Sequence, residues 1–408
     1  MTADVIVVGG GVVGLSSAWL AAGQGLAVTV LDPAPGRGAS WVAAGMLAPV
    51  TEATFGEEAL VGLLVAAAER WPAFAAALAD ATGADVGYRP CGTVAVAVDA
   101  DDRAVLDQML AFQQSLRLPA ERLLASDCRR LVPALSPGIR GGVHVPGDHQ
   151  VDNRRLLPAL LAACRRAGVT VVQQRADAVV VGPDGAAAGV ELADGTRLVA
   201  GTVLVAPGVD LGGLGGVPDG VLPPVHPVKG HVVRLRGPAD RPLLDRTVRG
   251  LVHGRPCYLV PRDDGTVVVG ATSEDRGFDR TVQAGAVHGL LDDARTLVPG
   301  IDELELVEAL AGLRPGSPDN APFVGRTALP RLLLAAGHYR NGILLAPLTA
   351  DAVTALLDGR PVPPALAPFG PDRAVPGRPV PVPDRPAPDR PVPGRPVPGR
   401  PGAARVAR

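Results

Sequence analysis

Residues 4–14 read DVIVVGGGVVG, which is an apolar run, a glycine cluster and the start of a second apolar segment. The first run is rich in β-branched residues, as expected for a strand that is buried on both faces. Gly9, Gly11 and Gly14 form the pattern G-x-G-x-x-G. In this pattern the first glycine permits a tight turn, the second lets the backbone approach a pyrophosphate, and the third allows close helix–strand packing. The stretch therefore predicts the strand, turn and helix that open a doubly wound α/β domain.

The segment that follows completes one βαβ unit. Small and apolar residues at 12–22 recur at helical spacing, and a second apolar run at 26–31 ends at Asp32. The helix N-terminus would offer free N–H groups to phosphates, and an acid about 20 positions after the glycines is placed to bind ribose hydroxyls. Because a carboxylate disfavours a 2′-phosphate, the unit predicts a dinucleotide other than NADP. A purely structural glycine turn is the alternative, and the motif does not separate NAD from FAD.

Composition excludes several other classes of protein. The 408 residues are 47% hydrophobic and 20% charged, with a net charge of -2, whereas a nucleic-acid partner would require an excess of Lys and Arg. Four widely spaced cysteines (Cys91, Cys128, Cys164 and Cys257) argue against a disulfide scaffold or a zinc site, and no other convincing metal ligands are found. The N-terminus lacks the pattern of a signal peptide, so we expect a cytoplasmic protein without a membrane partner.

The rest of the chain alternates helical and strand patterns to about residue 358. We expect a loop at 39–53, helices at 57–82, 101–117, 153–167, 284–297 and 341–357, and strands at 93–98, 141–145, 169–173, 179–181, 188–192, 197–205, 231–235, 257–261, 266–270, 304–313 and 332–336. A second strand–glycine–helix passage closes this part, so the nucleotide domain should be discontinuous. The expected fold class is α/β with an inserted α+β part. It combines a Rossmann-like doubly wound domain (1–85, 140–220 and 315–360) with an antiparallel-sheet substrate domain (86–139 and 221–314).

The C-terminal tail has a composition of its own. Sixteen of the 42 prolines lie between Pro361 and Arg408, where RPVP and GRP units repeat. Proline lacks an amide donor and resists both helix and sheet, so we expect residues 361–408 to be extended and disordered. Eight arginines after Gly370 suggest a weaker alternative, in which the tail binds a protein partner or nucleic acid.

Several longer stretches carry more specific patterns than the glycine motif. They are VIVVGGGVVG (5–14), ASWVAAGML (39–47), PVKG (227–230), CYLVPR (257–262), VGAT (269–272), AGLRP (311–315) and GHYRNGILLAP (337–347). Together, in this order, they resemble the D-amino-acid oxidase-type family of FAD-dependent oxidoreductases, and within it the glycine oxidases of thiamine biosynthesis. The resemblance runs from about residue 4 to residue 358, and the tail has no counterpart in the family.

The resemblance implies that FAD is the dinucleotide. No cysteine matches a site of covalent flavin attachment, so the resemblance implies noncovalent binding. The residues implied for FAD include the glycine motif and Asp32. The full set is Gly9, Gly11, Val12, Val13, Gly14, Asp32, Pro33, Ala39, Ser40, Ala44, Gly45, Met46, Ala178, His338, Tyr339, Arg340, Asn341, Gly342, Ile343 and Leu344.

The resemblance also implies a small amino-acid substrate. The planar fork of an arginine binds a carboxylate bidentately, and the resemblance implies this role for Arg314, assisted by the hydroxyl of Tyr258 and by Arg340. Met46 would shape a small pocket. A lone arginine is otherwise usually an ion-pair residue and a lone methionine usually core filler. Lys229 either lies near the flavin or pairs with a carboxylate. No acid–base residue is assigned, because a neutral amine can release a hydride without one.

The implied activity is oxidative deamination of glycine, or of another small amine or D-amino acid, with O2 as acceptor. Glycine would give glyoxylate, ammonia and H2O2, and would supply thiazole synthesis. Two departures from the family pattern bear on the exact substrate: Pro256 replaces a polar residue near the substrate, and residues 205–209, which include Pro207, replace a string ending in Gly-x-Trp. A sarcosine or D-amino-acid oxidase, a dehydrogenase of the same fold, and a non-catalytic flavin-binding protein are the alternatives. We also expect a homo-oligomer.

Overall fold

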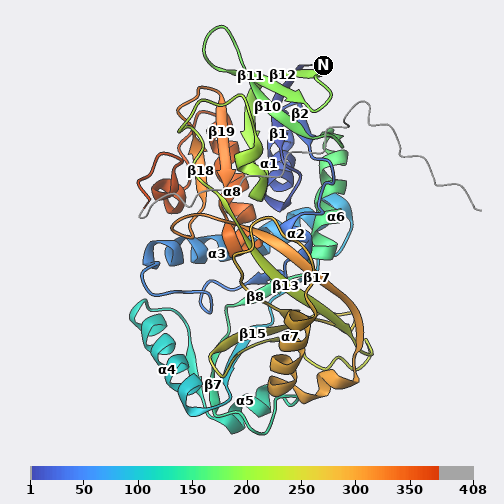
Figure 1. Ribbon diagram of the computed structural model, residues 1–408, viewed down its shortest axis with the longest axis vertical. Helices are drawn as coiled ribbons and strands as arrows, with labels where there is room; N and C mark the ends of the chain where they lie inside the picture. Colours follow the sequence, from blue (N-terminus) through green and yellow to red (C-terminus); the bar gives the residue numbers. More distant parts are fainter. Residues whose placement is uncertain (1, 376–408) are drawn as a thin grey trace, which may run out of the picture.

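The computed structural model describes residues 2–375, which form an upper half and a lower half, each around an eight-stranded sheet (Figure 1). In chain order the elements are β1 (Thr2–Val8), α1 (Val12–Gly23), β2 (Val28–Leu31), α2 (Ala39–Val42), β3 (Met46–Leu47), α3 (Glu58–Thr82), β4 (Tyr88–Arg89), β5 (Thr93–Ala97), α4 (Ala100–Ser115), β6 (Glu121–Leu123), α5 (Ala125–Leu131), β7 (Gly141–Val145), β8 (His149–Val151), α6 (Asn153–Arg166), β9 (Thr170–Val172), β10 (Ala176–Val181), β11 (Ala187–Leu192), β12 (Arg197–Val205), η1 (Gly208–Gly213), β13 (His226–Arg236), β14 (Thr247–Val252), β15 (Arg255–Pro261), β16 (Thr266–Gly270), α7 (Ala284–Leu297), η2 (Pro299–Glu303), β17 (Glu305–Gly316), β18 (Phe323–Arg326), β19 (Leu332–Ala336), η3 (Tyr339–Asn341), α8 (Gly342–Leu357) and η4 (Pro364–Phe369).

The upper sheet has the order β10-β11-β12-β1-β2-β9, with β19 beside β12 and β18 beside β19. β1 is parallel to both β2 and β12, and β12 is parallel to β19. Alternate residues of β1 enter different cores, since Val5 and Val7 pack with helices α1, α3, α6 and α8, whereas Ile6 and Val8 pack with β10–β12. Burial on both faces explains the uninterrupted apolar run of β1, and the α/β fold class is confirmed.

The lower sheet has the order β17-β13-β16-β15-β14-β5-β7-β6. Its neighbouring strands are antiparallel except for β5 and β14, which are parallel. Helices α5 and α7 supply part of its core, through Cys128 and Leu290 among others. The expected antiparallel sheet is therefore correct for every pair but one. β13 and β17 pair along their whole length, from the centre of the molecule into the lower half (Figure 1).

One expected domain boundary comes too early in the chain. Residue 140 was expected to return the chain to the nucleotide domain, yet β7 directly after it pairs with β5 and β6 in the lower sheet. The chain returns only after β8, which pairs with β3 and β4 in a separate three-stranded sheet. An apolar strand pattern gives no sign of which sheet the strand will join, and this is why the sequence placed the boundary too early.

Helix α3 is the one helix among the described residues that is long and apolar enough to cross a membrane. The structure uses it as a core helix of the upper half. Trp71 and Phe74 are each 1% exposed, and the indole Nε1 of Trp71 donates a hydrogen bond to the carbonyl of Leu344 in α8 at 2.9 Å. Its apolar face is thus buried against protein, as in an amphipathic helix of a globular domain.

Part of the tail expected to be disordered is folded. Between residues 361 and 375, η4 buries Leu366 and Phe369. Arg373 pairs with Asp319 at 2.8 Å, and its guanidinium lies 3.8 Å from the centroid of the Phe323 ring. Proline content alone missed this anchoring by apolar side chains and one arginine. The rest of the predicted tail, 376–408, lies outside the described residues.

Two smaller expectations also need correction. The segment expected to be a loop at 39–53 contains the short helix α2 and strand β3. Strand β14 was not expected at all, because Arg249 and Gly250 interrupt its apolar alternation. All three elements contribute residues to the cavity described next.

Candidate active site

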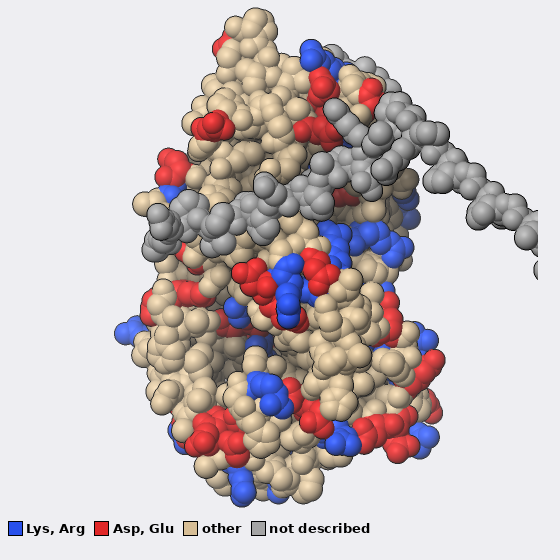
Figure 2. Space-filling model, viewed as in Figure 1, with Lys and Arg blue, Asp and Glu red and all other residues tan. Residues whose placement is uncertain are grey.

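A cavity of about 540 Å³ lies between the two halves of the molecule. Its walls come from the glycine turn after β1, the end of β2, α2 with the loop that follows, strands β13, β14, β15 and β17 of the lower sheet with the segment after β16, and residues 337–343. This size is typical of sites that hold a cofactor or a small ligand. On the face shown in Figure 2, acidic and basic side chains are interspersed, so that face offers no broad surface of one sign to a charged polymer.

The glycine turn is shaped by close contacts that exclude side chains. Gly9 has a φ of +108°, and a Cβ there would overlap the carbonyl of Ala206; a Cβ on Gly14 would overlap the carbonyl of Gly9. Gly11 is different, because its Cβ would meet only the hydroxyl of Ser40, at 3.4 Å. Gly11 is the N-cap residue of α1 and offers no side chain to cap it, so the helix N-terminus at Val12 and Val13 lines the cavity, with the hydroxyl of Ser40 accepting a hydrogen bond from the amide of Val12 at 3.1 Å. This cradle fits a pyrophosphate.

Asp32 lies at the end of β2 and lines the same part of the cavity. Its two carboxylate oxygens accept hydrogen bonds from the backbone amides of Gly10 and Ala34, each at 2.7 Å. A carboxylate oxygen has more than one acceptor position. Asp32 can therefore fix the glycine turn and still accept a hydroxyl from a bound nucleotide.

The loop after α2 is held on both sides by backbone and side-chain hydrogen bonds. The amide of Val151 donates to the carbonyl of Gly45 at 2.8 Å, and the amide nitrogen of Asn153 donates to the carbonyls of Ser40 and Trp41 at 2.8 and 2.9 Å. Gly45 has a φ of +71°, and a Cβ there would overlap the carbonyl of Val151. Only glycine suits this position, and the loop is fixed where Met46 enters the cavity.

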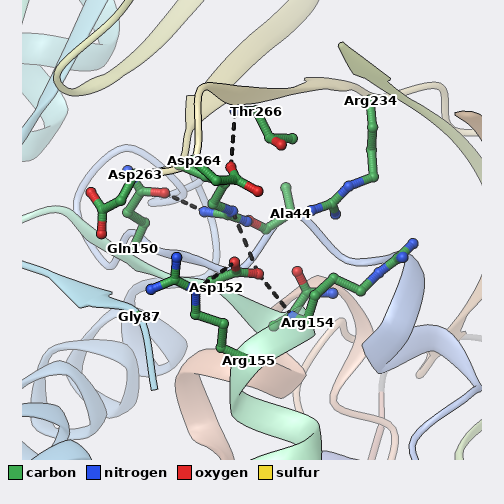
Figure 3. A network of polar contacts seen from close by, with 12 residues as sticks. Ala44, Gly87, Gln150, Asp152, Arg154, Arg155, Arg234, Asp263, Asp264 and Thr266 are labelled. Atoms are coloured by element: carbon green, nitrogen blue, oxygen red, sulfur yellow. Dashed lines mark hydrogen bonds and ion pairs between the residues drawn. The ribbon is translucent and has the colours of Figure 1, made fainter. Parts of the chain in front are cut away.

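A buried arginine, Arg262, completes this support; three of its partners, Ala44, Gln150 and Asp152, are labelled in Figure 3. Its guanidinium donates to the carbonyl of Ala44 and to Oε1 of Gln150, and its Nε lies 3.7 Å from Oδ1 of Asp152. Burial lowers the pKa of Arg262 to about 10, so the group stays charged at neutral pH. Arg262 belongs to the lower sheet and Ala44 to the upper half, so this network fixes the cavity wall across the boundary between the halves.

At the other end of the cavity lies Arg314, on β17. Its guanidinium covers Gly230 of β13, where a Cβ would overlap it. Nη1 donates to the carbonyls of Thr272 at 3.2 Å and Lys229 at 3.5 Å. Within residues 2–375 no carboxylate lies within 4.0 Å of Arg314. The guanidinium is thus positioned by backbone alone and faces the cavity with its charge unpaired by protein.

Lys229 itself is fully buried and does not face the cavity. Its Nζ lies 2.6 Å from Oδ2 of Asp279 and 2.8 Å from Oε1 of Gln283. The sequence left two roles open for Lys229, proximity to the flavin or pairing with a carboxylate, and the structure shows the pairing. The pair holds the segment after β16, which supplies the carbonyl of Thr272 that positions Arg314.

Tyr258 lies on β15 and lines the same end of the cavity. Its ring covers Gly270 of the adjacent strand, where a Cβ would overlap the phenol. Burial raises the pKa of Tyr258 to about 12, with Arg314 opposing the shift and Glu52 adding to it. The hydroxyl therefore remains protonated at neutral pH and can donate a hydrogen bond.

Sequence reasoning missed two charged residues at this end, Glu52 and Arg249. The guanidinium of Arg249 donates to Oε1 of Glu52 and lies 3.8 Å from the sulfur of Met46. Nη1 of Arg340 lies 3.3 Å from Oε2 of the same carboxylate. Burial opposes ionisation of Glu52, but the charges of Arg249 and Arg340 outweigh it and hold the pKa of Glu52 below its usual range. No local motif marks this cluster, because Arg249 lies on the unexpected strand β14.

His338 lies where η3 and α8 begin and also lines the cavity. It is 3% exposed, and its Nε2 lies 3.1 Å from the hydroxyl of Thr349. Burial lowers the pKa of His338 to about 4, so the ring is neutral at physiological pH. A neutral imidazole with its Nε2 engaged by Thr349 thus forms this part of the wall.

Most residues singled out from the sequence line this one cavity, and three do not. Gly14 packs beneath Gly9, and Leu344 is buried in α8. Ala178 lies outside the lining, whereas Ala176 is part of it, because a register irregularity in β10 separates the two. The predicted residues that the structure brings together are Gly9, Gly11, Val12, Val13, Asp32, Pro33, Ala39, Ser40, Ala44, Gly45, Met46, Tyr258, Arg314, His338, Tyr339, Arg340, Asn341, Gly342 and Ile343.

Comparison with known proteins agrees with this geometry. Residues 4–356 match the family model described as FAD dependent oxidoreductase (DAO). The chain is 34% identical over 375 residues to the glycine oxidase of Geobacillus kaustophilus, covering 91% of this chain and 97% of that protein. It is 33% identical over 371 residues to the bifunctional protein ThiO/ThiG of Trichormus variabilis, covering 90% of this chain but 55% of that protein. The crystal structure of the G. kaustophilus glycine oxidase superimposes with a TM-score of 0.84 at 33% identity, covering 92% of this chain and 99% of that one.

The glycine cradle at a helix N-terminus and the charged second end of the cavity define a dinucleotide-dependent oxidoreductase of two interleaved domains. More narrowly, the chain belongs to the DAO family of FAD-dependent oxidoreductases, and FAD is its cofactor. The family resemblance seen in the sequence is thereby confirmed. The residues present fit the group, since Gly9 and Gly11 leave room for its pyrophosphate and the fixed loop at Ala44 and Gly45 presents backbone without side-chain bulk.

Proposed function

We propose that the protein oxidises glycine, with O2 as the electron acceptor. Glycine, O2 and water give glyoxylate, ammonia and H2O2. The observation that carries this proposal is Arg314, a guanidinium that faces the cavity, is positioned by two backbone carbonyls and has no carboxylate partner among the described residues. An unpaired guanidinium beside a protonated phenol is suited to bind the carboxylate of an amino acid. The similarity to enzymes named glycine oxidase supports glycine over larger substrates.

Each residue at the substrate end would have a separate part in binding. Arg314 binds the substrate carboxylate, and the hydroxyl of Tyr258 donates a further hydrogen bond to it. Met46, held by the fixed loop and by Arg249, limits the space beyond Cα. Arg340 contributes positive charge at the edge of the site, where its side chain is 43% exposed. Together these contacts would fix Cα in one orientation, which is the largest part of catalysis that the protein can supply here.

Bound FAD accepts two electrons from the substrate and passes them to O2. The protein needs no acid–base residue for this step if the amine arrives neutral, because loss of a hydride from Cα then gives a protonated imine directly. Water hydrolyses the imine to glyoxylate and ammonia. His338, the imidazole nearest in sequence to the substrate residues, is neutral and engaged with Thr349, in agreement with a mechanism without a protein base.

The cellular role would be to supply thiazole synthesis in thiamine biosynthesis. The relative named ThiO/ThiG joins a segment similar to this chain to a second segment of about equal length, and such fusion supports a shared pathway. We also propose a cytoplasmic location, which the four cysteines, all free in the described structure, support. A homo-oligomer remains part of the proposal.

Anaerobic mixing with candidate substrates tests the proposal. Glycine should bleach the flavin absorbance faster, at equal concentration, than sarcosine, D-alanine or D-proline, and should release H2O2 in air. Faster bleaching by sarcosine or D-proline would mean that this compound, and not glycine, is the preferred substrate. Bleaching without O2 uptake would indicate a dehydrogenase, and a flavin that no amino acid bleaches would refute an amino-acid oxidase.

A further inference from the structure

The substrate end of the cavity contains a carboxylate that belongs to the protein. Glu52 lies 11% exposed between Arg249 and Arg340, and both guanidiniums donate to it. Arg314, in contrast, has no such partner in the described part of the chain. Two of the three guanidiniums at this end therefore share the carboxylate of Glu52, and Arg314, proposed to bind the substrate carboxylate, is the one without a carboxylate partner among the described residues.

Glu52 is also fixed in place by the protein behind it. The buried carboxylate of Asp148 accepts hydrogen bonds from the amides of Val50 and Thr51 at 3.0 and 2.8 Å. The side-chain amide of Gln113 donates to the carbonyl of Val50 at 3.0 Å. These bonds hold the backbone immediately before Glu52, so its carboxylate is pre-organised and cannot swing away to admit another anion without breaking two ion pairs.

We propose that Glu52 is a specificity-determining residue, which excludes amino acids that carry a second carboxylate. The carboxylate of Glu52 already fills the space between Arg249 and Arg340 that a second substrate carboxylate would take. It also neutralises the positive charge that would attract that second carboxylate. A substrate with a second carboxylate would have to approach a fixed like charge in a site partly closed to water, where the repulsion is weakly screened. Glycine carries no second carboxylate and is unaffected. This inference rests on the proposed amino-acid oxidase function.

The substitution Glu52→Gln tests the proposal, because it removes the charge and keeps the size. The probe is iminodiacetate, a glycine unit with a second carboxylate on the nitrogen. Iminodiacetate, O2 and water give glyoxylate, glycine and H2O2. Because the product is itself a substrate, the rate of anaerobic flavin bleaching is compared at the first turnover. We expect the ratio of kcat/KM for iminodiacetate to that for glycine to rise at least tenfold in Glu52→Gln.

Two controls separate the charge effect from a loosened site. Glu58→Gln removes an exposed acid from the same segment and should leave the ratio unchanged. Adding Arg249→Met to Glu52→Gln removes the proposed new partner of the second carboxylate and should cancel most of the gain. If both substrates slow by the same factor in Glu52→Gln, Glu52 is only structural and the proposal is overturned.

A measurement on the unaltered protein covers the case in which Glu52→Gln does not fold. Acetate and malonate are compared as ligands through their perturbation of the flavin spectrum, which requires no turnover. Malonate should bind no more tightly than acetate, and tenfold tighter binding would overturn the proposal. Failure of glycine to bleach the flavin would refute the proposed function instead, so the two failures are distinguishable.

Discussion

The two ends of the cavity are formed by different parts of the chain, mainly backbone and small residues at one end and charged side chains at the other. The nucleotide end is formed by glycines, alanines and backbone amides around Gly9 and Gly11, whereas the substrate end is formed by the side chains of Glu52, Arg249 and Arg314 with their neighbours. At the first end the backbone makes the site, because a Cβ at Gly9 or Gly14 would overlap a backbone carbonyl. At the second end the backbone only positions charges, and the charges make the site.

This difference separates stability from chemistry. A change at Gly9 or Gly14 should affect the folded chain before it affects any ligand, because the contacts excluded there are with backbone atoms, whereas a change at Gly11 should affect FAD binding alone. A change at the substrate end should leave the fold and the cofactor in place and alter only turnover. The following substitutions test whether the two ends of the cavity differ in this way.

The largest effect is expected from Gly9→Ala. Its methyl group would overlap the carbonyl of Ala206 at a φ that alanine rarely adopts, so we expect a loss of about 3 kcal/mol or more of folding free energy and no retained flavin. Gly11→Ala is the matched control, because its methyl group meets only Ser40 at an ordinary distance. That variant should fold normally and bind FAD at least tenfold more weakly. Thermal unfolding of the apoprotein measures folding stability, and flavin absorbance measures FAD binding. Normal FAD affinity in Gly11→Ala would mean that the pyrophosphate does not bind in this cradle.

Next in size is Arg314→Leu. Loss of a charge-assisted, bidentate interaction with the substrate carboxylate should raise KM for glycine by a factor on the order of a hundred, equivalent to about 3 kcal/mol. The purified variant should remain yellow. Gly230→Ala sharpens the test, because its methyl group displaces the guanidinium without removing it and should give a smaller rise in KM. Steady-state kinetics with glycine check both variants, and loss of flavin from Arg314→Leu would assign the arginine to the cofactor.

A pH effect of intermediate size is expected from His338. Burial lowers its pKa from 6.5 to about 4, so the unfolded chain binds a proton between these values and the folded chain does not. The free energy of unfolding should therefore fall as the pH drops from 6.5 towards 4, by up to about 3 kcal/mol from this group. Denaturant unfolding between pH 7.5 and 4.5 should show a shallower decline in His338→Asn. Parallel curves for the two proteins would contradict a buried neutral imidazole.

Asp148 acts in the opposite direction and must be kept in both proteins of that comparison. Burial raises the pKa of Asp148 from 3.8 to about 6, so the folded chain holds the extra proton in this window. Its contribution to stability is present below pH 3.8 and is lost as the pH rises through about 6. Because Asp148 is common to the unaltered protein and His338→Asn, the difference between their curves reports His338 alone.

The smallest effect is expected from Tyr258→Phe. Removing one hydroxyl that donates to the substrate carboxylate should lower kcat/KM for glycine roughly fivefold, equivalent to about 1 kcal/mol. FAD affinity and thermal stability should not change, since the ring still covers Gly270. Steady-state kinetics and flavin titration measure these quantities. A fall of more than a hundredfold would mean that the hydroxyl takes part in the chemical step.

The nucleotide end could be predicted from sequence because its parts are close together in the chain. The glycine turn and Asp32 fall within 30 residues, and the contacts among them are set by local backbone geometry. Arg314 was found through a longer string that resembles a family. Its support by the carbonyls of Thr272 and Lys229 could not be foreseen, since it depends on how three strands are arranged.

The cluster at Glu52 was beyond sequence reasoning for a physical reason. Glu52 and Arg249 are 197 residues apart, one in a loop and the other on a strand whose apolar pattern is broken by Arg249 itself. Their meeting depends on the parallel pairing of β14 with β5, which no periodicity reports. Ala178 lies outside the cavity lining, and a register irregularity in β10, which the sequence does not reveal, separates it from Ala176.

Arg373 has a consequence for shortening the chain. Cut after residue 360, the protein would leave the carboxylate of Asp319 without its guanidinium and would uncover the Phe323 ring on which that guanidinium lies. Phe323 begins β18, the strand that pairs with β19 just before the cavity segment at His338. Cut after residue 375, all of these contacts would survive. Among the described residues, Leu366, Phe369 and Arg373 anchor the end of the folded chain, and Arg373 lies twelve residues beyond Pro361, where the prolines begin to accumulate.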